Sequence, residues 1–139
     1  PIQIKLAPVN APYFQGCDLL VAADCTAFAY GAFHEDFLKG RVCLIGCPKL
    51  DGVDYTEKLA QIIAANNVRS VRVARMQVPC CGGLEQAVRR AVASAGSQSG
   101  SGNGGAVGSG SVASGVAGAT GIPVQIDVIS SDGRIVAVE

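Results

Sequence analysis

Strand-like and helix-like apolar segments alternate along most of this chain, and this alternation constrains the fold more than any single motif does. The segments typical of strands are 17–23, 41–47, 70–78 and 122–129. Between them, apolar residues recur at helical spacing over 26–38, from about 56 to 66, and from 84 to about 95. Repeated strand–helix–strand order is typical of a parallel sheet with right-handed crossovers. The sequence therefore predicts a three-layer, Rossmann-like α/β domain with a mostly parallel sheet.

Both ends of the chain add a strand-like segment to this pattern. Residues 2–6 alternate between apolar and polar side chains, as a half-buried edge strand does. Near the other end, Ser131-Asp132-Gly133 is a turn signal between the segments 122–129 and 134–138. We expect these last two strands to form an antiparallel hairpin at one edge of the sheet.

A Gly/Ser-rich insert at 97–121 interrupts the pattern within an expected single domain of residues 1–139. Its composition is typical of a flexible linker. Residues 100–105 formally match the GxGxxG fingerprint of dinucleotide-binding domains, but they follow a predicted helix instead of a strand. Because glycine-rich tracts produce such matches by chance, we expect no dinucleotide site there.

Charge and cysteine content narrow the class of protein. The formal net charge is zero and no basic stripe alternates with aromatics, which argues against nucleic acid or an anionic membrane as the main partner. Charges or glycines break every long apolar run, so we expect no transmembrane helix, and no secretory signal precedes the first strand. Six cysteines in a chain with long strand and helix signals indicate reduced thiols in a cytoplasmic protein.

Three consecutive predicted strands end in cysteine. The first ends at Cys25, the second at Cys47, and the third at the adjacent pair Cys80 and Cys81. Ligands of open parallel sheets bind outside the carboxyl ends of the strands, and neighbouring strands lie about 4.8 Å apart. Four thiolates in this arrangement suit a [4Fe-4S] cluster or a tetrahedral zinc ion. Because the short CxxC knuckles of structural zinc sites are absent, the spacing favours the cluster.

Glycines surround these cysteines in the sequence. Gly46 precedes Cys47, and Gly82 and Gly83 follow the cysteine pair. We expect them to leave room, and backbone N–H donors, for the inorganic sulfides of a cluster. The positive end of the helix that begins at Gly82 would offset the negative charge of the cluster.

The other two cysteines have a simpler interpretation. Cys17 lies at the start of its strand, and Cys43 lies inside a strand, so both are predicted to be small buried hydrophobic residues.

Several polar residues are weaker candidates for the same site. His34, the only histidine, is expected at an exposed helix position, although a ligand role stays open. Lys49 and Asp51 either line the mouth of the site or are solvated, and Asp24 either caps the next helix or tunes a thiol. A further set of arginines is predicted to form an exposed, salt-bridged face: Arg69, Arg72 and Arg75.

Four segments of the chain together resemble a known family. They are 10–14 (NAPYF), 22–31 (AADCTAFAYG), 45–51 (IGCPKLD) and 78–83 (VPCCGG). They are similar to the C-terminal domain of iron–sulfur cluster-binding, ferredoxin-like proteins of anaerobic bacteria and archaea. In that family a two-cluster ferredoxin module with CxxCxxC runs usually precedes this domain, and such runs are absent here. The Cys-Cys-Gly sequence is also similar to a motif of heterodisulfide reductases, whose later cysteines this chain lacks.

The resemblance implies a cluster held by Cys25, Cys47, Cys80 and Cys81, and electron transport with a redox partner protein or a ferredoxin module. The leading hypothesis is an iron–sulfur domain for one-electron transfer. The second is a redox enzyme that acts on a small substrate at an open cluster or a dithiol. The third is a zinc-binding structural domain that associates with copies of itself through the Gly/Ser-rich insert.

Overall fold

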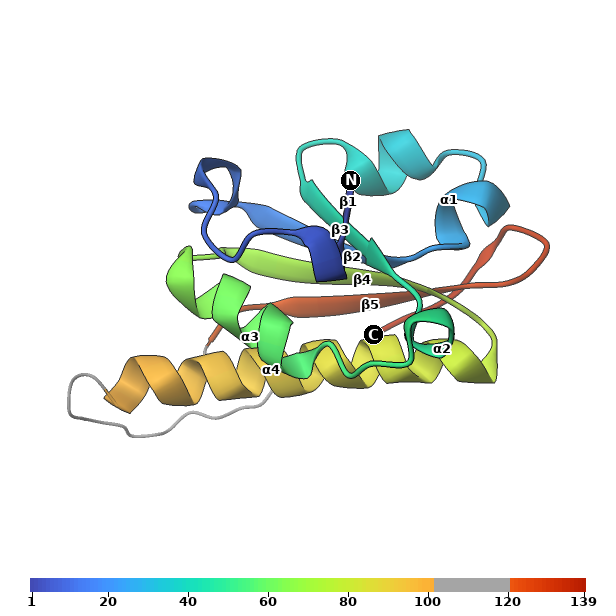
Figure 1. The fold of residues 1–139 in the computed structure, drawn as a ribbon. Helices are drawn as coiled ribbons and strands as arrows, with labels where there is room; N and C mark the ends of the chain where they lie inside the picture. Colours follow the sequence, from blue (N-terminus) through green and yellow to red (C-terminus); the bar gives the residue numbers. More distant parts are fainter. Residues whose placement is uncertain (102–120) are drawn as a thin grey trace.

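The computed structural model describes residues 1–101 and 121–139, with side chains through residue 96 in the first range. Its centre is a six-stranded sheet of order β1-β3-β2-β4-β5-β6 (Figure 1). The strands are β1 (Ile2–Gln3), β2 (Asp18–Ala23), β3 (Val42–Gly46), β4 (Ser70–Met76), β5 (Val124–Ile129) and β6 (Ile135–Val138). All neighbouring pairs are parallel except β5 and β6, which pair antiparallel. The predicted α/β class, with its antiparallel edge hairpin, is confirmed.

Helices cover both faces of the sheet, because the central strands are apolar on both sides. Every residue of β2 from Leu19 to Ala23 is buried, as is typical of a central parallel strand. Helices α3 (Thr56–Ala65) and α4 (Gly82–Ser101) pack side by side on one face. The short helix α1 (Thr26–Ala29) and the π-helical turn η3 (His34–Leu38) lie over the other face (Figure 1). The result is a three-layer α/β arrangement.

The α3 helix forms where the sequence predicts it. Leu59, Ile62 and Ile63 are buried against the sheet and α4. The carboxylate of Asp54 accepts a hydrogen bond from the backbone N–H of Thr56 at 3.0 Å, so this aspartate satisfies a free donor at the helix start.

The helix predicted over 26–38 is wrong as a continuous element. The chain leaves the helix at Tyr30, whose backbone is extended (φ −102°, ψ 111°). The Tyr30 ring then packs edge-on to Phe37 at 5.3 Å, and its hydroxyl donates to Asp36 at 2.6 Å. Because of this break, Phe28 points away from the core and is 93% exposed, whereas Phe33 and Phe37 are buried. Helical spacing alone did not distinguish the outward phenylalanine from the inward ones.

Two other element boundaries differ from the prediction. The α4 helix continues to Ser101 and so extends past Ala95 into the predicted insert, because a helix that is already formed propagates through single glycines at a cost of about 1 kcal/mol each. The rest of the insert, and with it most of the GxGxxG match, lies outside the described residues. Only Ile2–Gln3 forms a strand near the N-terminus, because the next residues turn and bury Ile4 completely.

The three predicted surface arginines are salt-bridged, but only one pair is at the surface. Arg69 is 70% exposed and pairs with Asp18. Arg72 forms a salt bridge with Asp127 at 2.8 Å, and the side chains of Arg72 and Asp127 are 17% and 1% exposed. The guanidinium of Arg72 also lies 4.3 Å from the centre of the Phe37 ring. Arg75 pairs with Glu85 of α4 at 2.9 Å and is also largely covered. The neighbouring strand β5 and the helices on both faces bury the last two pairs.

The β5–β6 hairpin turn depends on a glycine that touches α1. Gly133 has φ +91°, and a Cβ atom built on it would overlap the carbonyl oxygen of Ala29. We predict that Gly133→Ala lowers the free energy of unfolding by about 1–3 kcal/mol, or more if the backbone cannot shift. Urea denaturation measures this loss. Gly40→Ala is the matched control, because Gly40 also has a positive φ (+77°) but nothing lies within 4 Å of its added Cβ; equal losses in the two variants would contradict the prediction.

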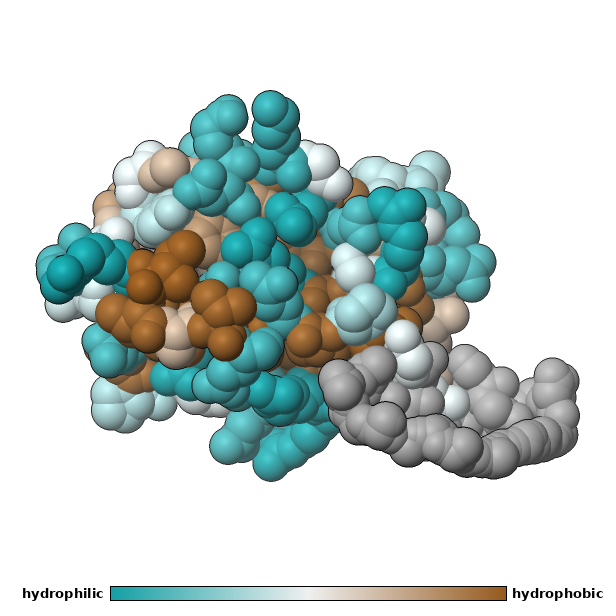
Figure 2. Space-filling view, turned by 180° about the vertical axis from the view of Figure 1, so that it is seen from behind, coloured by the Kyte–Doolittle hydropathy of each residue, from teal (hydrophilic) through white to brown (hydrophobic). Residues whose placement is uncertain are grey.

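The surface is apolar at its β6 edge. Ile135, Val136 and Val138 of β6 are 37–58% exposed. Figure 2 shows apolar side chains gathered on the face opposite to the view of Figure 1.

Within the described ranges, none of the helices has the length and apolar character needed to cross a membrane.

Candidate cysteine site

The strand order brings all four predicted cysteines to the same end of the sheet, where the parallel strands β2, β3 and β4 have their carboxyl ends. Cys25 follows β2 and precedes α1, and Cys47 follows β3 and precedes the short helix α2 (Pro48–Asp51). Cys80 and Cys81 lie after β4, in the 3-10 turn η4 (Pro79–Cys81) that leads into α4. Because β2 pairs with both β3 and β4, the three cysteine-bearing ends are neighbours. The crossover after β2 uses one face of the sheet and the crossover after β4 uses the other, so these strands flank a topological switch point.

The four thiols differ in exposure. Cys25 and Cys80 are exposed, Cys47 is half-buried and Cys81 is buried. Burial raises the pKa of the Cys81 thiol above its usual value, and the nearby thiols of Cys80 and Cys47 raise it further. Cys81 therefore interacts electrostatically with both of these thiols. Cys25 lies at the same end of the sheet, but its side chain faces solvent.

Hydrogen bonds brace the loops that carry the cysteines. The backbone N–H of Asp24 donates to the carbonyl of Gly46 at 3.1 Å, which ties the end of β2 to the end of β3. The Thr26 hydroxyl, fully buried, donates to the carbonyl of Ala23 at 2.8 Å. On the β4 side, Arg75 donates to the carbonyl of Val78 at 3.4 Å and places a positive charge under the η4 turn. These hydrogen bonds hold the backbone at the ends of β2, β3 and β4, next to the cysteines.

The three glycines predicted to leave room for sulfides have different roles. Gly82 is open, because no atom lies within 4 Å of an added Cβ. Gly83 faces α2, because an added Cβ would contact the Cβ of Pro48 at 3.4 Å. The prediction is wrong for Gly46, whose Cβ would lie 2.9 Å from the hydroxyl oxygen of Tyr55. Here the missing side chain makes room for a tyrosine instead of an inorganic sulfide.

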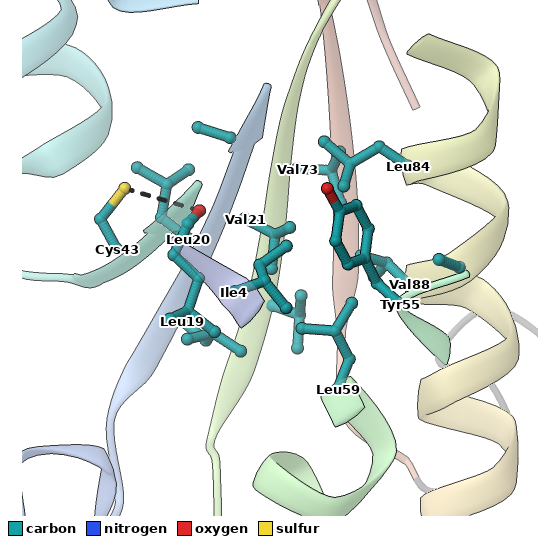
Figure 3. Close-up of a cluster of buried hydrophobic side chains, with 14 of the residues drawn as sticks. Ile4, Leu19, Leu20, Val21, Cys43, Tyr55, Leu59, Val73, Leu84 and Val88 are labelled. Carbon is teal, nitrogen blue, oxygen red and sulfur yellow. Dashed lines mark hydrogen bonds between the residues drawn. The ribbon is translucent and has the colours of Figure 1, made fainter. Parts of the chain in front are cut away.

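Sequence reasoning missed Tyr55, whose ring is 2% exposed. Figure 3 shows the ring packed beside Leu84 and Val88 of α4. Its hydroxyl accepts a hydrogen bond from the backbone N–H of Cys47 at 3.0 Å and donates to the carboxylate of Asp51. Burial and the bond to Asp51 raise the pKa of Tyr55 far above its usual value, so the hydroxyl stays protonated and keeps donating. A buried tyrosine in a loop carries no pattern of its own, although its four-residue spacing from Asp51 would have allowed a contact.

The remaining polar candidates lie as follows. Asp24 does not cap α1 with its side chain; its carboxylate accepts instead from Gln3 at 3.3 Å, because that amide lies across the sheet on β1. Asp51 is held by Tyr55, whereas Lys49 is exposed. His34 is exposed, as predicted.

The two cysteines outside the site pack in or against the core, and the predicted burial is confirmed for Cys43. Cys43 is buried within β3, and burial raises the pKa of its thiol to about 11. Cys17 is half-buried against the core, where burial and the neighbouring charge of Asp18 raise the pKa of its thiol.

Thiolates bind both iron–sulfur clusters and structural zinc, and the four candidate thiols follow three neighbouring strands. Within residues 1–101 and 121–139, no three cysteine, histidine or carboxylate side chains are close enough to share one metal ion. A single zinc ion needs four donors about 2.3 Å from one point. A [4Fe-4S] cluster binds each thiolate at a separate iron, so its ligands stand farther apart.

Comparison with known proteins agrees with the observed topology. Over residues 11–102, the sequence matches a family model described as a Rossmann-like domain. The chain belongs to this family of Rossmann-like domains. The matched residues run from the approach to β2 through α4, so they include every loop of the cysteine site.

A similar protein comes from Archaeoglobus fulgidus and is described as an uncharacterized protein. It is 31% identical to this Rossmann-like domain over 91 residues, which are 66% of this chain and 64% of the relative. The chain thus spans just under two thirds of the relative's length. No solved structure matches the sequence.

Proposed function

We propose that this Rossmann-like domain binds a [4Fe-4S] cluster through Cys25, Cys47, Cys80 and Cys81 and transfers single electrons. The observation that carries the proposal is the strand order β3-β2-β4, which makes neighbours of the three strand ends that bear these cysteines. The sequence resemblance to iron–sulfur proteins of anaerobes points to the same four residues.

The surroundings of the thiols favour a negatively charged group. Helix α4 is 20 residues long and directs its positive end toward the site, where it begins at Gly82. The guanidinium of Arg75 acts in the same direction, because it lowers the pKa of the nearby Cys81 thiol against the effect of burial. A cluster bound here would supply a one-electron acceptor and donor, and the chain would hold and orient it.

The described residues give less support to the enzyme hypothesis. Two cavities of about 330 Å³ each are lined by none of the four site cysteines: Pro1, Tyr13 and Cys43 help to line one, and Arg41, Pro123 and Glu139 the other. Neither brings Lys49 or His34 together with a thiol. The electron-transfer proposal therefore uses more of the observed geometry.

Anaerobic reconstitution of the full chain tests the proposal. After incubation with ferrous iron and sulfide and removal of unbound ions, we expect about four irons and four acid-labile sulfides per chain. Visible absorption that bleaches on reduction, and an EPR signal in the reduced state, should accompany them. A colourless chain that retains no iron would contradict the proposal. Retention of one zinc ion and no iron would instead identify the structural zinc alternative.

A further inference from the structure

Tyr55 lies directly beneath the backbone of one cysteine in the site, and the proposed function does not use it. The backbone N–H of Cys47 is the first donor after β3 and lies one residue before α2 begins. Free N–H groups next to cysteine ligands commonly donate to sulfur and raise the reduction potential of a cluster. In this chain the N–H of Cys47 donates to the Tyr55 hydroxyl instead, at 3.0 Å.

The structure is built to maintain this bond. The Tyr55 ring is 2% exposed, and Gly46 provides the space in which the hydroxyl sits. The Asp51 carboxylate accepts a hydrogen bond from the hydroxyl, so a lone pair of the tyrosine oxygen is free to accept from the amide. The N–H of Asp51 itself donates to the carbonyl of Cys47 at 2.9 Å, which holds both partners of the tyrosine in one turn.

We propose that Tyr55 is a positioning residue of the cysteine site, which holds the Cys47 amide away from sulfur and so keeps the reduction potential of the bound cluster low. The effect on the reduction potential rests on the proposed cluster-binding function, whereas the positioning of Cys47 does not. The Tyr55–Asp51 pair fixes the conformation of Cys47 whether or not a cluster is present. The negative charge of Asp51 behind the hydroxyl adds to the same effect on the potential, because it disfavours the more negative, reduced state.

Tyr55→Phe removes the hydroxyl and leaves the ring that packs against α4. In the metal-free chain, amide hydrogen exchange followed by NMR should show Cys47 exchanging several-fold faster than in the wild type. In the reconstituted chain, the reduction potential should move to a higher value, because the freed N–H can donate to sulfur. Tyr30→Phe is the matched control: it removes a tyrosine–aspartate hydrogen bond of 2.6 Å away from the cysteines and should change neither quantity.

Asp51→Asn is a second variant that keeps the tyrosine in place. It weakens the acceptor and removes the negative charge, so Cys47 exchange should quicken by less than in Tyr55→Phe, and the reduction potential should again move to a higher value. A folded Tyr55→Phe chain with unchanged Cys47 exchange, or with the wild-type potential, would overturn the inference. A wild-type chain that takes up no cluster contradicts the cluster proposal instead, and the exchange measurement on the metal-free chain then decides the positioning role alone.

Discussion

Replacing Cys80 and Cys81 together with serine is expected to reduce the iron retained after reconstitution to background. The pair supplies two of the four proposed ligands from one short turn, and the remaining thiols of Cys25 and Cys47 cannot hold a four-iron cluster between them. Iron and acid-labile sulfide per chain, together with visible absorption, measure the loss.

The chain contains its own control for this experiment. A variant that carries Cys17→Ser and Cys43→Ala also loses two thiols, but both lie outside the site, half-buried or buried in the core. We expect this variant to retain the wild-type amount of iron. Equal loss of iron in the two double variants would show that the cysteines act through the fold instead of as ligands.

Arg72→Ala is expected to lower the free energy of unfolding by about 3–5 kcal/mol, the usual cost of removing one member of a buried ion pair. The substitution leaves the carboxylate of Asp127, which is 1% exposed, without its cationic partner, so a negative charge stays buried without compensation. The loss of the guanidinium over the Phe37 ring adds to this cost. Chemical denaturation monitored by circular dichroism measures the change in the free energy of unfolding.

Arg69→Ala is the comparison that isolates burial. Arg69 also pairs with an aspartate from a neighbouring strand, but its side chain is 70% exposed. An exposed ion pair contributes less than about 1 kcal/mol. Equal losses in the free energy of unfolding for Arg72→Ala and Arg69→Ala would contradict the larger contribution that we assign to the buried Arg72–Asp127 pair.

The alternation of strand and helix segments was sufficient to predict the parallel architecture, because it reflects which side chains a chain must bury at each position. It also located the cysteines at strand ends, since each of them follows an apolar run directly. The hairpin was predictable for the same local reason: its turn residues are adjacent in the sequence. These properties depend on a few consecutive residues and on the periodicity of one element at a time.

Other features depend on contacts between residues far apart in the sequence. Arg72 and Asp127 are 55 residues apart, and only the pairing of β4 with β5 shows that their salt bridge is buried. The helical spacing of 26–38 fits a continuous helix and a broken one equally well. The edge-on packing of Tyr30 on Phe37 accompanies the break that turns Phe28 outward.

The cysteine site combines both kinds of information. The sequence alone determined which thiols end the strands of a parallel sheet, because strand ends and following turns are local signals. Only the tertiary structure decided that these strands are neighbours in the order β3-β2-β4, since crossover connections can place a strand on either side of β2. It also decided that the space above Gly46 belongs to Tyr55, a residue from another loop. Side chains from separate elements compete for the same buried volume, and no local pattern records which of them occupies it.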